Sequence, residues 1–290
     1  MRLAWTRRMP VMVSFILPVR NAVDTIDEAV ERVLYADLGH SELCREVIVV
    51  DDASSDGTTA SLRRLASRGL ARVSFLPEVL GRGAALSTGL ASASGELVVL
   101  ADATLAYDPA EVSRLLTPIT AGTADVVYGS RYVAGPRHVP KLWDRVMDRV
   151  LTGASNGLTN ISLSDVTTTY QAFRADAVRG AVLRADGRAI ASELAALFAA
   201  RQCRIFEVPV SYRTDRRSAS HGRWLESVAQ LTMMARCRLR SWQLGELMPH
   251  RPLPTTEPVA TRGARLTRLL HPVDLVPISP AAARPMLRAN

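Results

Sequence analysis

The sequence predicts an α/β fold with a mostly parallel central sheet, because runs typical of strands alternate with segments typical of helices over residues 11–131. The first run, Val11–Leu17, is apolar and ends in Pro18, as expected of a strand buried on both faces. Two more apolar runs, Glu46–Asp51 and Glu96–Ala101, end at or beside aspartates. Strands separated by helices form βαβ units, and the strands of such units are parallel.

The helices between these strands are indicated by apolar residues at helical spacing and by turn residues that precede them. Thr25 and Glu28 fit a capping box at the start of the first helix. The turn Gly81–Gly83 and Pro109 open later helices. In chain order we expect a strand at 11–17, a helix from 26, a strand at 46–51, a helix to about 67, a strand at 72–76, a helix at 84–93, a strand at 96–101, a helix from 109, a strand at 125–129, a helix at 190–200 and a strand at 204–211.

The second half of the chain is less regular. Residues 136–187 show no clear periodicity, and Pro209 places the last strand at an edge of the sheet. Segment 225–239 is amphipathic and ends in arginines, so it either packs on the core or lies on an anionic membrane. We therefore expect one domain over 1–240, with parts 11–131 and 132–240, followed by a Pro/Arg-rich tail over 241–290.

Composition narrows the class of protein. Hydrophobic residues make up 48% of the chain and charged residues 22%, as in folded globular proteins, whereas aromatic residues at 5% do not favour nucleic-acid stacking. The net charge of +8 comes almost wholly from arginine, which reflects genome composition or anionic partners such as phosphates. Three scattered cysteines and no long apolar segment predict a cytoplasmic protein, with peripheral membrane contact as an alternative.

Acidic residues follow two of the predicted strands. Asp51 and Asp52 follow one strand, and Asp102 follows another. The carboxyl ends of parallel strands share one edge of a sheet, where ligands of such sheets bind. Carboxylates there can accept hydrogen bonds from a nucleobase or ribose and can hold a divalent cation that bridges a diphosphate, although such residues also cap helices. The Gly81–Gly83 turn, with Arg82, and Arg131 at another strand end add candidate phosphate contacts.

Seven segments together resemble family 2 glycosyltransferases, most closely the dolichol-phosphate mannosyltransferase and polyprenyl-phosphate glycosyltransferase branch. They run in family order across residues 13–225. They are Phe15–Asn21, Val47–Thr58, Leu80–Leu90, Val98–Pro109, Asp125–Arg131, Asp165–Arg174, and Phe206–Tyr212 with Arg216 through His221. The resemblance implies a GT-A fold, with residues 11–131 binding a nucleoside-diphosphate sugar and residues 132–240 on the acceptor side.

The resemblance also implies site residues. Pro18 and Asp52, with Val50 beside them, would hold the nucleobase and ribose. Asp102 would bind Mg²⁺ or Mn²⁺ as the first aspartate of the family's Asp-x-Asp motif. The residues expected to contact the donor or its phosphates are Pro18, Arg20, Val50, Asp52, Arg82, Asp102, Ala103, Thr104, Arg131, Arg216 and His221.

The chain departs from the family pattern at the metal motif. Thr104 stands where relatives have the second aspartate, and Arg20 with Ala22 replaces part of an early Tyr-Asn-Glu motif. A cation held by Asp102 alone would depend on the donor's phosphates and water, which Mg²⁺ tolerates. Alternatively, Arg20, Arg131 and Arg216 would neutralise the leaving diphosphate without a metal.

The mechanism that the resemblance implies is displacement at the sugar's anomeric carbon with inversion. A lipid-phosphate acceptor arrives ionised and needs no general base, whereas a hydroxyl acceptor does. We expect Asp102, Arg131 and Asp165 to be catalytic; Asp165 is the candidate base, with Glu193 behind it. Three hypotheses about the function follow: a polyprenyl-phosphate glycosyltransferase, a transferase for a soluble hydroxyl or nucleoside acceptor, and a non-catalytic sugar-nucleotide-binding protein.

Overall fold

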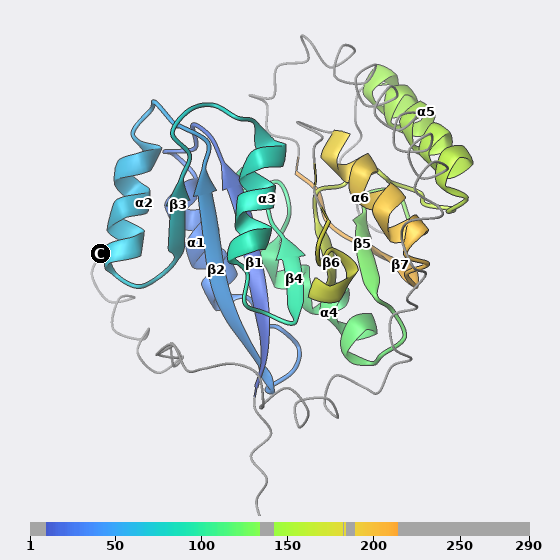
Figure 1. Cartoon of the computed structure of the whole chain (residues 1–290), viewed down its shortest axis with the longest axis horizontal. Coiled ribbons are helices and arrows are strands. Elements are labelled where there is room, and N and C mark those ends of the chain that lie inside the picture. The colour runs from blue at the N-terminus through green and yellow to red at the C-terminus, as the bar shows by residue number, and fades with distance from the viewer. Residues whose placement is uncertain (1–9, 134–141, 182, 184–188, 214–290) are drawn as a thin grey trace, which may run out of the picture.

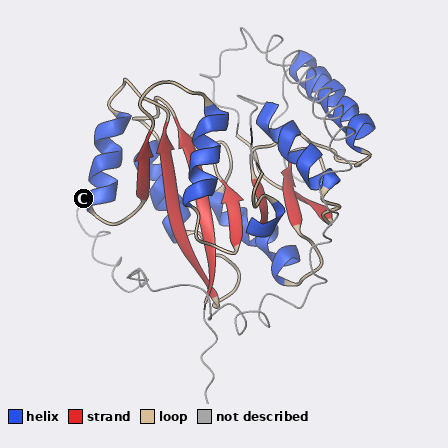
Figure 2. Cartoon of the chain, in the orientation of Figure 1, coloured by secondary structure: helices blue, strands red, loops and turns tan. Residues whose placement is uncertain are grey.

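The computed structural model describes residues 10–133, 142–181, 183 and 189–213, which build a seven-stranded sheet between layers of helices (Figure 1, Figure 2). The strands lie in the order β3-β2-β1-β4-β6-β5-β7. Their bounds are β1 (Val11–Val19), β2 (Leu43–Asp51), β3 (Arg72–Phe75), β4 (Leu97–Leu100), β5 (Val126–Ser130), β6 (Gln171–Arg174) and β7 (Ile205–Pro209). Strand β6 is antiparallel to both of its neighbours and the other pairs are parallel, so the predicted α/β class is confirmed.

Helices cover both faces of the sheet. Their bounds are α1 (Ile26–Tyr35), α2 (Thr58–Ser67), α3 (Arg82–Ser92), α4 (Val112–Thr120), α5 (Leu142–Thr159) and α6 (Ala189–Ala200), with short 3₁₀ turns at Pro109–Glu111 and Ala175–Ala177. Helices α3 and α6 lie on the near face in Figure 1, and α1 and α4 lie behind the sheet. Helix α5 packs against α6 at the outer side of the near layer.

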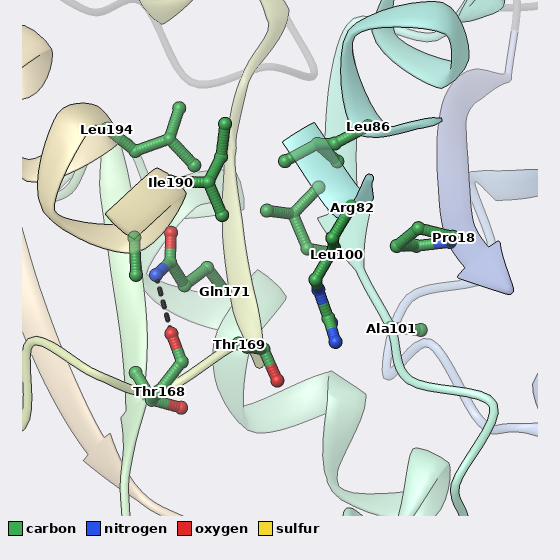
Figure 3. Close-up of a pocket in the computed structure, with 11 residues that line it drawn as sticks. Pro18, Arg82, Leu86, Leu100, Ala101, Thr168, Thr169, Gln171, Ile190 and Leu194 are labelled. Atoms are coloured by element: carbon green, nitrogen blue, oxygen red, sulfur yellow. Dashed lines mark hydrogen bonds between the residues drawn. The ribbon is translucent and has the colours of Figure 1, made fainter. Parts of the chain in front are cut away.

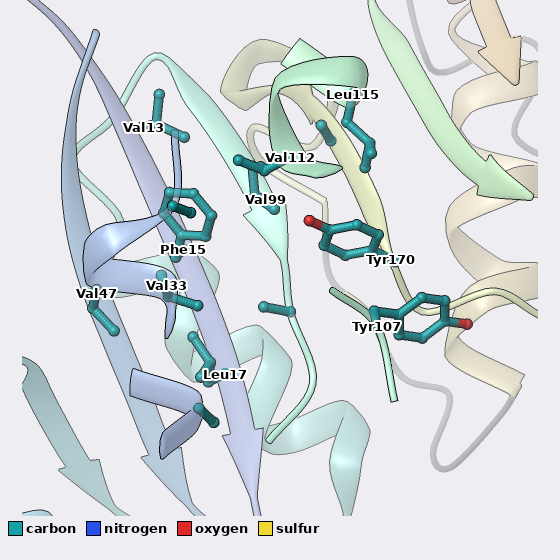
Figure 4. Packing of buried hydrophobic residues seen from close by; sticks show 14 of the residues in the cluster. Val13, Phe15, Leu17, Val33, Val47, Val99, Tyr107, Val112, Leu115 and Tyr170 are labelled. Carbon is teal, nitrogen blue, oxygen red and sulfur yellow. The ribbon is translucent and has the colours of Figure 1, made fainter. Parts of the chain in front are cut away.

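Strand β1 is the centre of the core because its side chains are buried on both faces. Phe15 and Leu17 pack with residues of α1 and α4 in one cluster, of which Figure 4 shows a part. Ile16, between them in sequence, packs on the opposite face with residues of α3 and α6. Alternate residues of a strand face opposite sides, so the apolar run is explained by two covered faces.

Some local predictions were wrong. The Thr25 side chain makes no capping hydrogen bond to the start of α1, so the predicted capping box does not form. Its hydroxyl instead donates to the carbonyl oxygen of Ala22 at 3.4 Å. Helix α5 and strand β6 lie in the region 136–187, where the sequence pattern is less regular and we named no element. Segment 225–239 and the tail 241–290 lie outside the described residues.

The carboxylate of Glu46 joins three strands and the loop before β4. It accepts hydrogen bonds from the Ser14 hydroxyl at 2.5 Å, from the Ser94 N–H at 2.7 Å and hydroxyl at 2.8 Å, and from Arg72 at 3.1 Å. Burial works to raise the pKa of Glu46, but these hydrogen bonds outweigh it and lower the pKa below its ordinary value of 4.5. The charged form therefore stabilises the fold.

We expect Glu46→Gln to lower the free energy of unfolding by about 1–3 kcal/mol near neutral pH, because hydrogen bonds to a charged group are lost. Since the folded pKa is depressed, this contribution is present above pH 4.5 and disappears as the pH falls through the lower folded pKa. Urea unfolding across this pH range measures it. The exposed Glu42→Gln variant is the control, and a difference for Glu46→Gln that does not shrink in acid would contradict the assignment.

Gly89 sets the distance between α3 and the sheet. A Cβ at this position would lie 2.4 Å from a methyl carbon of Ile16 in β1, whereas a Cβ at Gly157 in α5 would meet nothing within 4 Å. We expect Gly89→Ala to destabilise the protein by about 1–3 kcal/mol by overpacking. The same change at Gly157 should stabilise it by about 0.5–1 kcal/mol, because alanine is the better helix former. Thermal unfolding tests the opposite signs, and equal effects at both positions would refute this packing argument.

Candidate active site

The carboxyl ends of β1, β2 and β4 bring the predicted donor-binding residues to one edge of the sheet. Pro18 pairs with Val50 between β1 and β2, and Ile16 pairs with Leu100 between β1 and β4. Asp102 follows β4 by two residues. The side chains expected to act together are therefore gathered by the order of the strands.

Hydrogen bonds fasten the loop after β1 to the loop after β2. The Asn21 N–H donates to the Ser54 hydroxyl at 2.9 Å, and the Ser55 N–H donates to the Asn21 side chain at 2.9 Å. Asn21 has φ of 51° and Ala53 has φ of 50°, a left-handed conformation that costs energy for alanine. These contacts hold both strand ends in one arrangement at the site.

The carboxylate of Asp52 fixes the start of α3. It accepts the N–H of Leu80 at 2.8 Å and the N–H of Gly81 at 3.0 Å, and its residue is 4% exposed. Gly81 has φ of 89°, which glycine adopts without strain. Asp52 thereby places Arg82, the first residue of α3, beside the strand ends. The carboxylate is engaged by the protein itself, so its predicted contact with a ribose or nucleobase stays a prediction.

Asp51, the preceding aspartate, has a local role. Its carboxylate accepts hydrogen bonds from the N–H and hydroxyl of Ser54 at 3.1 and 2.5 Å, and from the Thr59 hydroxyl at 2.7 Å. Thr59 lies in the first turn of α2. Asp51 thus fastens the loop after β2 to α2 without capping that helix, while Asp52 reaches a different loop.

Asp102 and Arg82 form an ion pair at the site. The guanidinium of Arg82 lies 3.7 Å from the Asp102 carboxylate, and the two side chains are 32% and 14% exposed. The other Asp102 oxygen accepts the Thr104 N–H at 2.9 Å. Arg82 therefore supplies a positive charge where a diphosphate is expected, next to a carboxylate.

The residues present do not form a metal site by themselves. Asp102 is the carboxylate at the expected place, and Thr104, which is exposed, offers a hydroxyl in place of a second carboxylate. Within the described ranges, no group of three or more histidine, cysteine, aspartate and glutamate side chains is arranged to hold a metal ion. A cation at Asp102 would therefore depend on ligands from the donor.

Arg131 and Asp165 form a buried bidentate pair. Arg131 Nε and Nη2 lie 2.7 and 2.8 Å from the two Asp165 oxygens, and Nη2 lies 3.4 Å from Asp148. Arg131 Nη2 also donates to the Thr167 hydroxyl at 2.5 Å. Burial opposes the charge, but the Asp165 and Asp148 carboxylates outweigh it, so the pKa of Arg131 lies well above its ordinary value.

This pairing bears on two expectations. Arg131 was expected to face a phosphate, yet its side chain is 11% exposed and is directed at Asp165 and Asp148. Asp165 was the candidate general base, yet its side chain is 0% exposed and both of its oxygens accept from Arg131. A carboxylate held in this way stabilises the Arg131 cation in this structure. The general-base role of Asp165 stays a prediction.

Aromatic rings enclose the Arg131 guanidinium. Its central carbon lies 5.3 Å from the Tyr132 ring and 5.2 Å from the Tyr212 ring. Tyr212 packs on Tyr107 at 5.0 Å, and Tyr107 stacks on Tyr170 at 5.2 Å. Cation–π contacts stabilise a charge in such a place. Through Asp165 and Tyr212, Arg131 therefore links the end of β5 to the loop before β6 and to the segment after β7.

A small pocket opens beside the Arg82–Asp102 pair, between the α3 and α6 sides of the near layer (Figure 3). Pro18, Arg82 and Ala101 line it at the sheet edge. Further in, its walls are side chains of α3, β4, β6 and α6, with Thr168 and Thr169 from the loop before β6. The pocket thus connects the predicted donor site to the other half of the sheet.

The remaining predicted residues fall into three groups. Val50 and Ala103 are 0% and 3% exposed, so both are buried at the strand ends and their predicted donor contacts stay predictions. Arg20 is exposed at the end of β1, and Glu193 is partly exposed on α6. Arg216 and His221 lie outside the described residues.

Sequence reasoning missed several residues of the site. Asp148 lies on α5, a helix that we did not expect, and Gln171 lies on β6, a strand that we did not expect. Thr168 and Thr169 lie within a segment that carried the resemblance, but no role was assigned to them. Their position could have been found only by recognising that β6 inserts between β4 and β5.

None of the helices in the described part of the chain has both the length and the apolar composition to cross a bilayer.

Residues 14–180 match the model of glycosyl transferase family 2. The chain is 29% identical over 213 residues to dolichol-phosphate mannosyltransferase from Pyrococcus furiosus, covering 72% of this chain and 58% of that protein. It is 30% identical over 204 residues to undecaprenyl-phosphate 4-deoxy-4-formamido-L-arabinose transferase from Edwardsiella ictaluri, covering 69% and 59%. The chain spans less than two thirds of the length of these relatives.

Solved structures show the same fold. Glucosyl-3-phosphoglycerate synthase from Mycobacterium tuberculosis with Mn²⁺, uridine diphosphate and phosphoglyceric acid gives a TM-score of 0.59 at 22% identity, over 78% of each chain. The same enzyme with Mg²⁺ and uridine diphosphate gives 0.59 at 21% identity, over 78% of this chain and 79% of the other. The GT-A fold is thus confirmed. With more than half of its length matched by the family model, the chain belongs to glycosyl transferase family 2.

Proposed function

We propose that this chain transfers a sugar from a UDP- or GDP-linked donor to a polyprenyl phosphate, with inversion at the anomeric carbon. The donor side rests on Pro18, Asp52, Arg82 and Asp102 at one sheet edge, the edge where ligands of such folds bind. The acceptor side rests on the curated relatives, whose names include dolichol-phosphate and undecaprenyl-phosphate transferases. Donor and acceptor are thus argued from different observations.

One observation carries the choice of acceptor. Asp165, the carboxylate expected to act as a general base, is fully buried and paired with Arg131. A hydroxyl acceptor needs such a base, whereas a phosphate monoester is already ionised near neutral pH. The engagement of both Asp165 oxygens by Arg131 supports the phosphate acceptor over a soluble hydroxyl.

In the proposed reaction an acceptor phosphate oxygen attacks the anomeric carbon. The bond from that carbon to the donor's diphosphate breaks, and its electron pair leaves with the nucleoside diphosphate. The Arg82 guanidinium neutralises the charge that develops on the leaving group, and Asp102 orients Arg82. Positioning and charge compensation supply most of the rate enhancement in such a displacement.

A divalent cation is the part of the proposal that depends most on the donor. Mn²⁺ and Mg²⁺ are present in the solved glucosyl-3-phosphoglycerate synthase complexes. In this chain Asp102 would be a single protein ligand, with donor phosphates and water completing the shell.

Donor binding and its cation dependence can be measured by thermal shift. We expect a UDP- or GDP-sugar to raise the melting temperature with concentration, more so with Mg²⁺ or Mn²⁺, and Asp102→Ala to weaken this effect. Thr104→Asp should strengthen the cation-dependent part of donor binding, because it adds a second carboxylate. The apparent Kd for the donor with the cation should fall roughly tenfold. Stabilisation that is indifferent to both the cation and Asp102 would refute the metal part. Stabilisation by no nucleotide sugar would refute the donor part.

The acceptor is tested by transfer of labelled sugar to polyprenyl phosphate and its extraction into organic solvent. Glu193→Gln should keep activity within about threefold, because an ionised acceptor needs no base. Loss of about a hundredfold or more, with donor binding intact, would contradict base-free transfer and place a base at Glu193. Transfer to a soluble hydroxyl compound in place of polyprenyl phosphate would support the hydroxyl acceptor. Donor binding with no turnover on any acceptor would favour a non-catalytic binding protein.

A further inference from the structure

The pocket beside Arg82 contains a buried oxygen atom without a hydrogen-bond partner. Gln171 is 1% exposed, and its side-chain oxygen Oε1 has no partner in the described part of the chain. Its amide nitrogen donates to the Thr168 carbonyl oxygen at 2.8 Å, the contact drawn in Figure 3. This bond sets the orientation of the amide, so Oε1 is turned away from Thr168. A buried acceptor left in this state is costly unless something donates to it.

The topology explains why this residue lies at the site. Strand β6 is antiparallel to its neighbours, so its first residue lies at the edge where β4 and β5 end. Gln171 pairs with Leu100 of β4 and with Tyr128 of β5. Leu100 is followed by Ala101 and Asp102. The amide therefore lies in the strand next to the one that leads to the ion pair.

The dimensions of the pocket limit what can occupy it. Its volume is about 20 Å³, which is enough for one group of the size of a water molecule. The inner walls are apolar and come from Leu86, Leu100, Ile190 and Leu194 (Figure 3). A whole sugar ring does not fit, but one hydroxyl or hydroxymethyl group does. The outer residues Pro18, Arg82 and Ala101 connect this space to the donor edge.

We propose that this pocket receives one hydroxyl or hydroxymethyl group of the transferred sugar, and that Gln171 Oε1 accepts its hydrogen bond and so determines which sugars bind. The inference rests on the proposed function, because it needs a nucleoside-diphosphate sugar at the strand ends. A site with a buried acceptor rejects an analogue that lacks the matching donor, since the acceptor then stays unpaired.

The test compares three ligand classes by calorimetry or thermal shift: the nucleoside diphosphate, its preferred sugar conjugate, and monodeoxy analogues of that conjugate. In the wild type, one deoxy analogue should bind about five- to tenfold more weakly than the parent, as expected for one lost hydrogen bond. Gln171→Met should weaken binding of the parent conjugate by a similar factor. The variant should bind the deoxy analogue no more weakly than it binds the parent. Binding of the nucleoside diphosphate should not change.

Two further variants control for general effects of a substitution on folding and affinity. Ser87→Ala removes another buried hydroxyl without a partner in the described residues, on α3 and not lining the pocket, and should change no affinity. Ala191→Val adds methyl groups to the pocket wall on α6 and should weaken the sugar conjugate alone. If Gln171→Met does not fold, Ala191→Val carries the test.

The outcomes separate this inference from the proposed function. The pocket assignment would be overturned if Gln171→Met weakened binding of the parent conjugate and of its deoxy analogues equally. It would also be overturned if both pocket variants kept the wild-type preference for the parent over the analogues. Donor binding would stand in either case. Failure of every nucleotide sugar to bind the wild type would overturn both.

Discussion

The hydrogen bonds from Leu80 and Gly81 to the Asp52 carboxylate are the contact on which the rest of the site depends. They fix the first turn of α3 against the end of β2. Arg82 follows directly and meets Asp102 at the end of β4. A carboxylate at the start of a helix also interacts favourably with the positive end of the helix dipole. One buried aspartate thus couples two strands, a helix and the Arg82–Asp102 ion pair.

A second ionic contact organises the other half of the molecule. Arg131 at the end of β5 binds Asp165 before β6 and Asp148 on α5. Ser164, next to Asp165, donates to Glu207 of β7 at 2.9 Å. Removing one partner of a buried pair leaves an uncompensated charge, so these residues hold this half of the molecule as one unit. Polar residues in a segment that carried the resemblance therefore have a framework role in this structure.

The two halves meet where the strand direction reverses. Strand β6 enters between β4 and β5 with opposite polarity, and it brings the loop of Thr168 and Thr169 to the edge that already holds Asp102. The pocket therefore combines residues from distant parts of the chain. Its walls come from α3 and α6, helices that pack on the same face of the sheet.

Much of the first half could be predicted from sequence. The apolar runs of β2 and β4, with aspartates at or after their ends, and the glycine turn before α3 are local signals that place Asp52, Arg82 and Asp102. Strand β6 could not be predicted, because it has four residues and begins and ends with Gln171 and Arg174. All four residues are buried between neighbouring strands, and a polar end residue gives no periodic signal.

The sequence by itself determined the α/β class, the family resemblance and the strand-end positions of the acidic residues, because these follow from local periodicity and turn chemistry. Only the tertiary structure decided which charges are available. Asp52 is engaged by a backbone loop, Asp165 is neutralised by Arg131, and the oxygen of Gln171 is left without a partner. Each of these outcomes depends on contacts between residues far apart in the chain, and burial and pairing at such distances have no local signature.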